Sequence, residues 1–246
     1  MADVALITGG ANGIGRAVSL KLASHGIAVA IADWDGKAAE ETSAAIVSQG
    51  GRAEAFRVDV RRAAEVKGVV AGVLSRHGHV DILANIAGGS IHRKPIEELS
   101  WVEWKEVLDI NLKGTFLFCR EVAPIMMRQK KGRIVNTASN YGVTGSALRT
   151  PYSAAKAGVI GFSKSLALEL APYEVRVNVV APGPTDTPRV MANWTPEIRK
   201  QREAEIPRRR MGRPDDLAEA FYFFCGPESA WMTGQTLHVN GGLVMP

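Results

Sequence analysis

Three side chains in the middle of the sequence have the types and spacing of a proton-transfer centre. Tyr152 and Lys156 are four residues apart, so on a helix they project from the same face. An ammonium beside a phenol stabilises the phenolate, which lets a group that titrates near pH ~10 act as a base near neutrality. Ser139, which precedes them, can hold the same substrate oxygen. The set suits proton exchange with an alcohol or a carbonyl, although a surface Lys above a packed Tyr has the same spacing.

A glycine-rich turn near the start of the chain predicts a dinucleotide site. The apolar run Asp3–Thr8 is expected to form a buried strand, and the stretch Arg16–His25 an amphipathic helix. Strand, glycine turn and helix in this order place backbone N–H groups and a helix amino terminus where a pyrophosphate binds. A tight turn without a ligand is the alternative. The turn residues expected to contact the cofactor are Gly9, Asn12, Gly13, Ile14 and Gly15.

The residue after the second apolar run bears on which dinucleotide binds. Ile27–Ala32 leads into Asp33, whose carboxylate is placed to take the adenosine ribose hydroxyls, with Trp34 beside it. A carboxylate there would repel a 2′-phosphate, and the following Trp34 and Asp35 bring no cation. We therefore expect NAD rather than NADP.

Ordered motifs along nearly the whole chain resemble those of the short-chain dehydrogenase/reductase family. The match extends from Asp3 to Gly242, with Ile86 and Thr185 as departures that remove no catalytic group. Within the family, the sequence is similar to 3-oxoacyl-carrier-protein reductases and to secondary-alcohol or polyol dehydrogenases. The motifs are Thr8-Gly9-x-x-x-Gly13-x-Gly15, Asp59-Val60, Asn85-Ile86-Ala87-Gly88, Asn111, Ser139, Tyr152-x-x-x-Lys156 and Pro182-Gly183.

The resemblance implies a role for each of these residues. Tyr152 would be the general acid/base, Lys156 would lower its pKa and bind the nicotinamide ribose, and Ser139 would orient the reacting oxygen. Asn111 would bend its helix and hold a water that links Lys156 to solvent; a solvent-facing Asn is the alternative. The residues implied to surround the cofactor at the strand ends are Asp59, Val60, Asn85, Ala87, Gly88, Pro182, Gly183, Thr185 and Thr187.

Apolar runs alternate with helical stretches, which predicts an α/β fold with parallel strands, right-handed crossovers and helices on both faces. The resemblance implies one Rossmann-type domain, residues 1–246, with a doubly wound seven-stranded sheet of order 3-2-1-4-5-6-7. Strands are expected at Asp3–Thr8, Ile27–Ala32, Arg52–Val58, Val80–Asn85, Gly132–Ser139, Val175–Ala181 and Gln235–Val239. Helices are expected at Gly13–His25, Lys37–Gln49, Ala63–His77, Trp101–Gln129, Pro151–Leu170 and Pro214–Phe224.

The charged segment near residues 188–207 is bracketed by prolines and is expected as an insertion, either a substrate lid or a plain mobile loop. Arg149, three residues before Tyr152, is placed to meet a carboxylate or phosphate of the substrate, or to pair with a neighbouring Glu.

Small residues along Ala154–Gly161 favour close helix packing. The resemblance implies that this packing joins subunits of a homotetramer; packing within one subunit is the alternative.

Composition limits the partners that we expect. The length of 246 residues suits one domain with a large core, and charges or glycines interrupt every apolar run, so no membrane span is expected. The scattered histidines predict no metal site. Cys119 and Cys225 are expected as buried free thiols in a reducing compartment. Because the first strand begins at Asp3, we expect no signal peptide and a cytoplasmic location.

The net charge of +5 has three explanations: nucleic-acid binding, attraction of an anionic substrate, or a solvated surface with local salt bridges. We favour the last and expect no nucleic-acid partner. The basic residues concentrated late in the chain are Arg189, Arg199, Lys200, Arg202, Arg208, Arg209, Arg210 and Arg213.

The sequence as a whole predicts an NAD-dependent oxidoreductase that interconverts a small secondary alcohol and a ketone. The oxidative direction is favoured because cells keep NAD mostly oxidised. The alternative is a reductase of 3-oxoacyl thioesters on a carrier protein or coenzyme A. A non-catalytic NAD-sensing protein would share the nucleotide half of the chain, but it would have no reason to keep the Ser-Tyr-Lys set.

Overall fold

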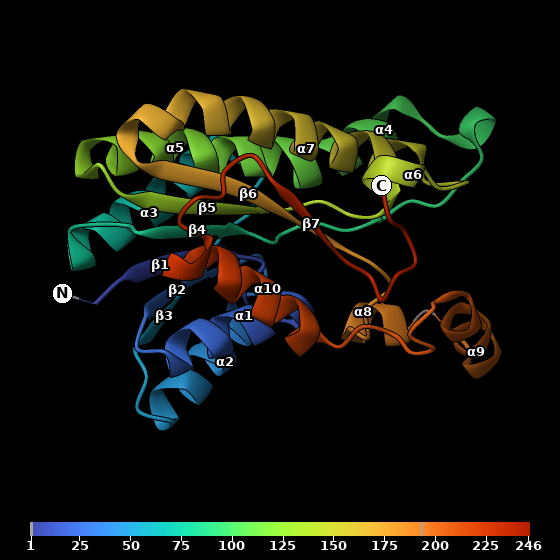
Figure 1. The fold of residues 1–246 in the computed structure, drawn as a ribbon, viewed down its shortest axis with the longest axis horizontal. Helices are drawn as coiled ribbons and strands as arrows, with labels where there is room; N and C mark the ends of the chain where they lie inside the picture. Colours follow the sequence, from blue (N-terminus) through green and yellow to red (C-terminus); the bar gives the residue numbers. More distant parts are fainter. Residues whose placement is uncertain (1, 193) are drawn as a thin grey trace.

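A seven-stranded parallel sheet forms the centre of the molecule (Figure 1). The computed structural model describes residues 2–192 and 194–246, so Met1 of the predicted domain and Asn193 of the predicted lid lie outside the described residues. The strand order is β3-β2-β1-β4-β5-β6-β7, which confirms the prediction. The strands are β1 (Val4–Thr8), β2 (Ala28–Asp33), β3 (Ala53–Arg57), β4 (Ile82–Asn85), β5 (Gly132–Thr137), β6 (Val175–Pro182) and β7 (Thr236–Val239).

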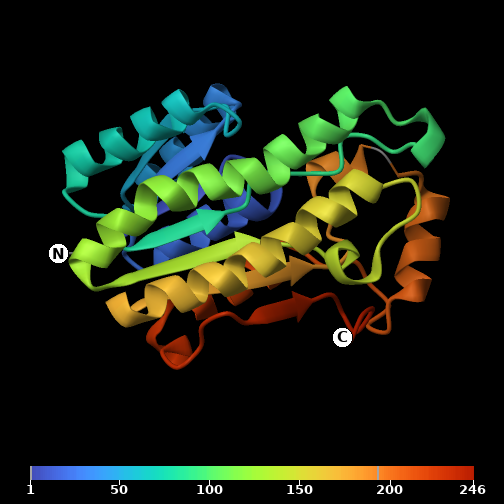
Figure 2. The ribbon, with the colours of Figure 1, turned by 90° about the horizontal axis from the view of Figure 1, so that it is seen from above.

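Helices cover both faces of this sheet (Figures 1 and 2). One face carries α1 (Gly13–Ser24), α2 (Gly36–Ser48) and α10 (Pro214–Cys225). The other face carries α3 (Ala63–His77), α5 (Gly114–Gln129) and α7 (Thr150–Leu170). The shorter elements are η1 (Ile96–Glu98), α4 (Trp101–Leu108), η2 (Asp109–Lys113), α6 (Tyr141–Thr144), η3 (Ala171–Tyr173), α8 (Pro188–Met191), α9 (Pro196–Glu205) and η4 (Pro227–Ser229).

Side chains of the central strand alternate between two cores. Val4 and Leu6 of β1 pack in the cluster that contains residues of α3, α5 and α7. Ala5 and Ile7 pack in the cluster that contains residues of α1, α2 and α10. A strand buried on both faces requires a continuous apolar run, which is why the sequence pattern identified this strand.

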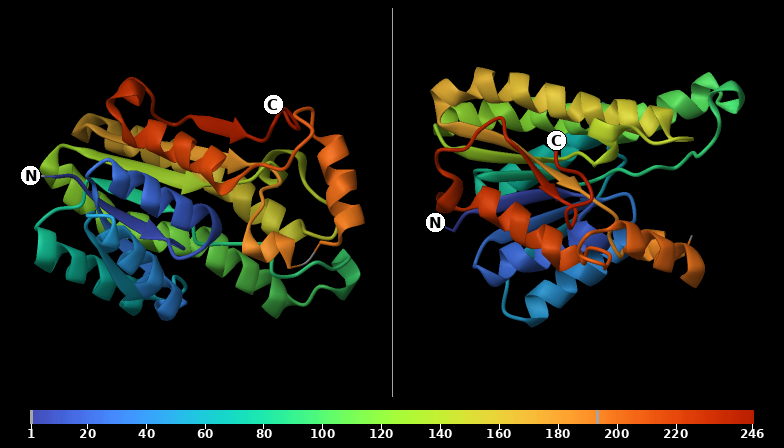
Figure 3. Two further views of the ribbon diagram at one scale, coloured as in Figure 1. Left: turned by 90° about the horizontal axis from the view of Figure 1, so that it is seen from below. Right: turned by 45° about the vertical axis from the view of Figure 1, so that its right-hand side comes forward.

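The carboxyl ends of the strands gather the candidate site at one edge of the sheet. All strand pairs are parallel, so these ends point the same way. The chain reverses its direction of winding between β1 and β4, and ligands of such sheets bind at this switch point. Figure 3 shows α8 and α9 projecting beyond the same edge.

One predicted helix, Trp101–Gln129, is interrupted in the structure. It consists of α4, a π-helical turn over η2, and α5. Asn111 lies in the π-turn, where its Nδ2 donates to the Val107 carbonyl oxygen at 2.9 Å. In a regular α-helix the Val107 carbonyl would accept a hydrogen bond from the backbone N–H of Asn111. Here the Asn111 side chain donates to it instead, and the regular α-helical hydrogen-bond pattern is interrupted at this point.

Candidate active site

The turn between β1 and α1 packs so closely that two positions require glycine. Gly9 has φ of +65°, and a Cβ there would lie 2.7 Å from Ala87 Cα. A Cβ on Gly15 would overlap the carbonyl oxygen of Gly9. Asn12 is the N-cap of α1, and its side chain makes no capping bond within the described chain. The turn therefore presents the amino end of α1 as a place where an anion can bind.

Asp33 ends β2 beside this turn, and backbone groups fix both of its oxygens. Oδ2 accepts from the N–H of Ala11 at 3.1 Å, and Oδ1 accepts from the N–H of Asp35 at 3.2 Å. Trp34, in contrast, is 73 % exposed. The structure also places Arg57, the last residue of β3, in register with Asp33. A search for a cation directly after Asp33 in the sequence misses Arg57, because the two meet only in the sheet.

Asp59, after β3, belongs to a chain of charges. Arg61 and Arg62 approach its Oδ2 at 2.8 and 3.6 Å, and hydrogen bonding with Arg61 lowers the pKa of Asp59. Arg61 also pairs with Glu106 of α4 at 3.1 Å, and Glu106 contacts His92 Nε2 at 3.0 Å. The implied adenine contact is therefore linked to the loop of residues 90–94.

The side chain of Asn85 points into the interior between β4, β5 and α7. Its Nδ2 donates to Asn136 Oδ1 at 2.8 Å and contacts Cys119 Sγ at 3.4 Å. Asn136 Nδ2 in turn donates to Ser163 Oγ at 2.9 Å. This leaves the backbone of Asn85, rather than its side chain, for a contact with a cofactor.

Asn111 is fully buried, so the solvent-facing alternative is wrong. Its Oδ1 accepts from the N–H of Gly89 at 2.9 Å, and its Nδ2 donates to the Gly89 carbonyl at 3.0 Å. A Cβ on Gly88 would lie 2.5 Å from Asn111 Oδ1 and 3.3 Å from Lys156 Nζ. The chain after β4, the π-turn and α7 thus meet at one point.

Helix α7 places Tyr152 and Lys156 beside the end of β5. Lys156 Nζ lies 5.7 Å from the centroid of the Tyr152 ring and donates to the carbonyl of Thr137 at 2.7 Å. Ser139 hydrogen-bonds with Tyr152. The structure therefore brings the three residues of the proposed proton-transfer set together.

Burial controls how this set titrates. Burial raises the pKa of Tyr152 above its usual 10, while the Ser139 hydrogen bond and the charges of Arg149 and Arg189 act to lower it. Burial also lowers the pKa of Lys156 to about 7. At Tyr152 desolvation outweighs the favourable charges, and at Lys156 it disfavours the ammonium itself. The implied effect of Lys156 on the Tyr152 pKa stays a prediction.

The end of β6 approaches the glycine turn. Thr185 Oγ1 donates to the carbonyl of Gly183 at 3.0 Å, just after Pro182 closes the strand. Thr187 caps α8 by accepting from the N–H of Val190 at 3.4 Å. A Cβ on Gly13 would lie 3.1 Å from Thr187 Cγ2. The segment after β6 thus lies against the amino terminus of α1.

Arg189 is exposed, as its assignment to the charged surface predicted, but it also contacts the chain after β4. Its Nη1 donates to the Gly88 carbonyl at 2.9 Å, so the side chain spans from α8 to the chain after β4. The sequence offered one indication of this contact, because Arg189 follows by two residues Thr187, which was expected to lie at the cofactor. Local salt bridges do hold other basic residues of this region, namely Arg199 with Asp186, Arg202 with Glu205 and Arg210 with Asp216.

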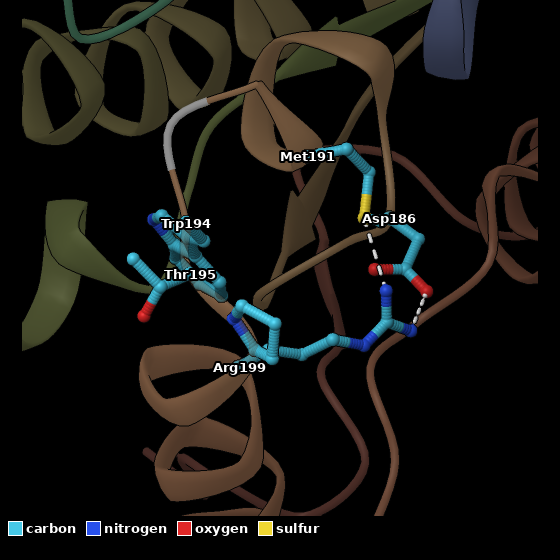
Figure 4. A pocket seen from close by; sticks show the side chains of 6 residues that line it. Asp186, Met191, Trp194, Thr195 and Arg199 are labelled. Carbon is cyan, nitrogen blue, oxygen red and sulfur yellow. Dashed lines mark hydrogen bonds and ion pairs between the residues drawn. The ribbon is translucent and has the colours of Figure 1, made fainter.

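A hollow of about 130 Å³ lies between α8 and α9 (Figure 4). Arg199 reaches across it to pair with Asp186 and donates to Met191 Sδ at 3.0 Å. Trp194, Thr195 and Pro196 complete its lining. Because Asp186 directly follows Thr185, the ion pair fastens α9 to the end of β6.

Other features of the described residues bear on partners. No three or more His, Cys, Asp or Glu side chains among them are grouped to hold a metal ion. Within the same part of the chain, every helix is too short or too polar to cross a membrane. Cys119 and Cys225 are buried free thiols, and burial raises the pKa of each to about 12.

The family model described as enoyl-(acyl carrier protein) reductase matches residues 9–244. The chain belongs to the short-chain dehydrogenase/reductase family of oxidoreductases. It is 38% identical over 241 residues to the 3-oxoacyl-acyl-carrier-protein reductase FabG of Aquifex aeolicus, covering 98% of this chain and 96% of that protein. It is 40% identical over 240 residues to the hydroxy(phenyl)methylsuccinyl-CoA dehydrogenase subunit BbsD of Thauera aromatica, covering 97% and 95%.

A solved structure gives the same answer for the fold. A variant of the actinorhodin polyketide ketoreductase, determined with NADPH, superposes with a TM-score of 0.95 at 35% identity. The alignment covers 98% of this chain and 97% of the ketoreductase. These comparisons confirm the predicted family and fold.

Proposed function

We propose that this protein reduces the keto group of a 3-oxoacyl thioester to a hydroxyl group, using a reduced nicotinamide dinucleotide. The support is the similarity, over almost the whole chain, to a 3-oxoacyl-acyl-carrier-protein reductase, together with the Ser139–Tyr152–Lys156 set. The second relative also acts on a thioester of coenzyme A, as its name states. The relatives favour this alternative over NAD-linked oxidation of a simple secondary alcohol.

The relatives carry the direction of the proposed reaction, because three of them are named as 3-oxoacyl-acyl-carrier-protein reductases. Reduction consumes a proton at the carbonyl oxygen. Burial raises the pKa of Tyr152, so the phenol holds the proton that this step needs.

The proposed chemistry adds a hydride to the carbonyl carbon and a proton to its oxygen. The reduced nicotinamide supplies the hydride when it is bound. Ser139 holds the carbonyl oxygen by a hydrogen bond, and Tyr152 Oη gives its proton to that oxygen as the C=O bond becomes C–OH. Lys156, with a pKa of about 7, exchanges protons near neutrality and serves as the adjacent proton reservoir. Asn111 positions Gly89 beside it.

Residues at the carboxyl edge fit a dinucleotide. The pyrophosphate fits the glycine turn at the amino end of α1, and the adenosine ribose fits Asp33. The full set that we propose is Gly9, Asn12, Gly13, Ile14, Gly15, Asp33, Trp34, Asp59, Val60, Asn85, Ala87, Gly88, Tyr152, Lys156, Pro182, Gly183, Thr185 and Thr187.

NAD is the dinucleotide that we infer. Ala11 and Asp35 hold the Asp33 carboxylate in place, so a 2′-phosphate would meet a fixed negative charge. Arg57 acts in the opposite sense from the neighbouring strand, but it is exposed to solvent, which screens its charge. The actinorhodin ketoreductase was determined with NADPH, so the choice is a property of this chain to be measured directly.

The segment near 188–207 is proposed to be the substrate lid. Helices α8 and α9 project past the carboxyl edge of the sheet (Figure 1), and the Asp186–Arg199 ion pair links α9 to the segment after β6. Weakening of this ion pair by Arg199→Gln should raise the KM for the thioester while leaving cofactor affinity unchanged.

We also propose a homotetramer. Helices α5 and α7 lie side by side on one face (Figure 2), where Phe116 of α5 and Leu168 of α7 are 42% and 79% exposed. A second copy would cover these apolar side chains. A monomeric mass in light scattering would contradict this proposal.

The test of function compares two reaction directions. Purified protein is given acetoacetyl-CoA with NADH or NADPH, and loss of reduced-cofactor absorbance is followed. Secondary alcohols and polyols with NAD or NADP form the second panel. We expect thioester reduction that Tyr152→Phe abolishes. Oxidation of the alcohols without reduction of the thioester would contradict the proposed reductase and support an alcohol dehydrogenase.

A further inference from the structure

Arg149 is held next to the proton-transfer set by an aromatic contact. Its guanidinium lies over the Tyr141 ring, 5.2 Å from the centroid. The N–H of Tyr141 donates to Ser139 Oγ at 3.2 Å, and Tyr152 follows Arg149 by three residues at the start of α7. A cation stacked on an aromatic ring keeps the edges of its guanidinium available for other partners.

Arg189 approaches the same set from α8. Its Nη1 lies on the Gly88 carbonyl at 2.9 Å, and a Cβ on the neighbouring Gly89 would overlap the guanidinium. The Gly88 backbone is itself packed against Lys156 Nζ. The charges of Arg149 and Arg189 both act on Tyr152, in the direction that lowers its pKa. Both guanidinium groups therefore lie near enough to Tyr152 to act on its charge, Arg149 through the Tyr141–Ser139 side and Arg189 through the chain at Gly88.

The backbone directly before Arg149 is strained. Leu148 has φ of +64°, a conformation that costs a branched residue roughly 1–2 kcal/mol. A hydrogen bond from the N–H of Lys94 to the Leu148 carbonyl, at 3.0 Å, fastens this residue to the 90–94 loop. Strain of this kind is found more often at functional positions than elsewhere in proteins.

We propose that Arg149 and Arg189 bind an oxyanion of the substrate, a carboxylate or a phosphate, close to the carbon that is reduced. This inference rests on the proposed keto reduction and narrows its substrates to anionic ketones. Guanidinium groups bind either anion through paired N–H donors. A plain 3-oxoacyl thioester is neutral around its keto group, and its phosphates lie at the far end of the pantetheine arm. A second acid group on the acyl chain provides the missing negative charge.

The experiment compares matched ketones on the wild-type protein and two variants. The probes are 3-oxoadipyl-CoA, whose acyl chain ends in a carboxylate, its methyl ester, and dihydroxyacetone phosphate for the phosphate arm. Wild type should prefer an anionic probe over the ester. Arg149→Gln and Arg189→Gln should each lower the ratio of kcat/KM for that probe over kcat/KM for the ester by ~10- to 100-fold, mainly through the KM of the anionic probe. Arg128→Gln, exposed at the far end of α5, is the matched control and should leave this ratio unchanged.

The outcomes separate this inference from the proposed function. Equal kcat/KM for acid and ester in the wild type, a measurement that needs no variant, overturns the inference while reduction of both thioesters upholds the function. Reduction of dihydroxyacetone phosphate alone, dependent on both arginines, upholds the oxyanion site and contradicts the thioester assignment. A raised KM for the nicotinamide cofactor in Arg189→Gln, with the acid-to-ester ratio unchanged, assigns Arg189 to the dinucleotide and overturns its role here.

Discussion

The two halves of the carboxyl edge are built by different means. In the nucleotide half, the backbone makes the site: Gly9 and Gly15 are needed because no Cβ fits there. In the reaction half, side chains make the site, and Ser139, Tyr152 and Arg189 come from three separate segments. A backbone site tolerates changes of neighbouring side chains, whereas a side-chain site depends on the whole fold and on single residues.

Tyr152→Phe should separate the two halves most strongly. The phenyl ring keeps the packing of α7 but has no proton to donate, so kcat should fall by ~10³-fold or more. Cofactor affinity, set mainly in the nucleotide half, should stay within about 3-fold of wild type. Steady-state kinetics and calorimetric titration with the dinucleotide measure the two quantities. Appreciable remaining turnover would remove Tyr152 from the role of general acid.

Asn111→Ala tests a residue where the halves meet. Gly89 loses both of its bonds to the side chain, and we expect kcat to fall by ~10- to 100-fold with a loss of about 1–3 kcal/mol in unfolding free energy. Asn178→Ala is the control, because Asn178 makes the same kind of double contact, with Met232 and Gln235. It should lose similar stability and keep its activity. Equal loss of activity in both variants would make Asn111 a purely structural residue.

Asp33→Ala probes the nucleotide half alone. Removal of the carboxylate should shift the ratio of kcat/KM for NADH over NADPH toward NADPH by about tenfold, with kcat nearly unchanged. Arg57→Ala should move the same ratio in the opposite direction, since it removes the nearby cation. Assays with both cofactors on the three proteins give the result, and a wild-type preference for NADPH would refute the inferred choice.

The smallest expected effect is the change in stability that Lys156→Met causes. The Lys156 pKa is about 7 when folded and near its ordinary 10.5 when unfolded, so the unfolded chain binds more protons between these values. Wild-type stability from this group is therefore lowest at and below pH 7 and rises toward pH 10.5. The Met variant lacks this penalty and should have the higher Tm at pH 7, with the gap closing as pH rises. A lower Tm at pH 7 would argue against a desolvated ammonium.

The sequence predicted the inner strands of the sheet well because they are buried on both faces and read as continuous apolar runs, as in β1. It predicted one uninterrupted helix over 101–129. The spacing of apolar residues does not reveal that the Asn111 side chain bonds to the Val107 carbonyl and interrupts the α-helical hydrogen bonds. It placed Arg189 on the surface, where the side chain is exposed, but it did not predict the contact with Gly88. That residue reaches Gly88 across 101 positions of chain, a contact that only the folded arrangement of α8 and β4 creates.

The hydrogen-bonded trio of Asn85, Asn136 and Ser163 fixes where α7 sits along the sheet. Ser163 bonds inward to Asn136 and also to the Val159 carbonyl one turn back, so it is anchored from both sides. If the helix slid by a single turn, about 5.4 Å, the Asn136 amide would lose its bond to the Ser163 hydroxyl and be buried in an apolar interior without that hydrogen-bond partner. Tyr152, the proposed general acid, is thus set at a fixed height above β5 by a bond three turns away along α7.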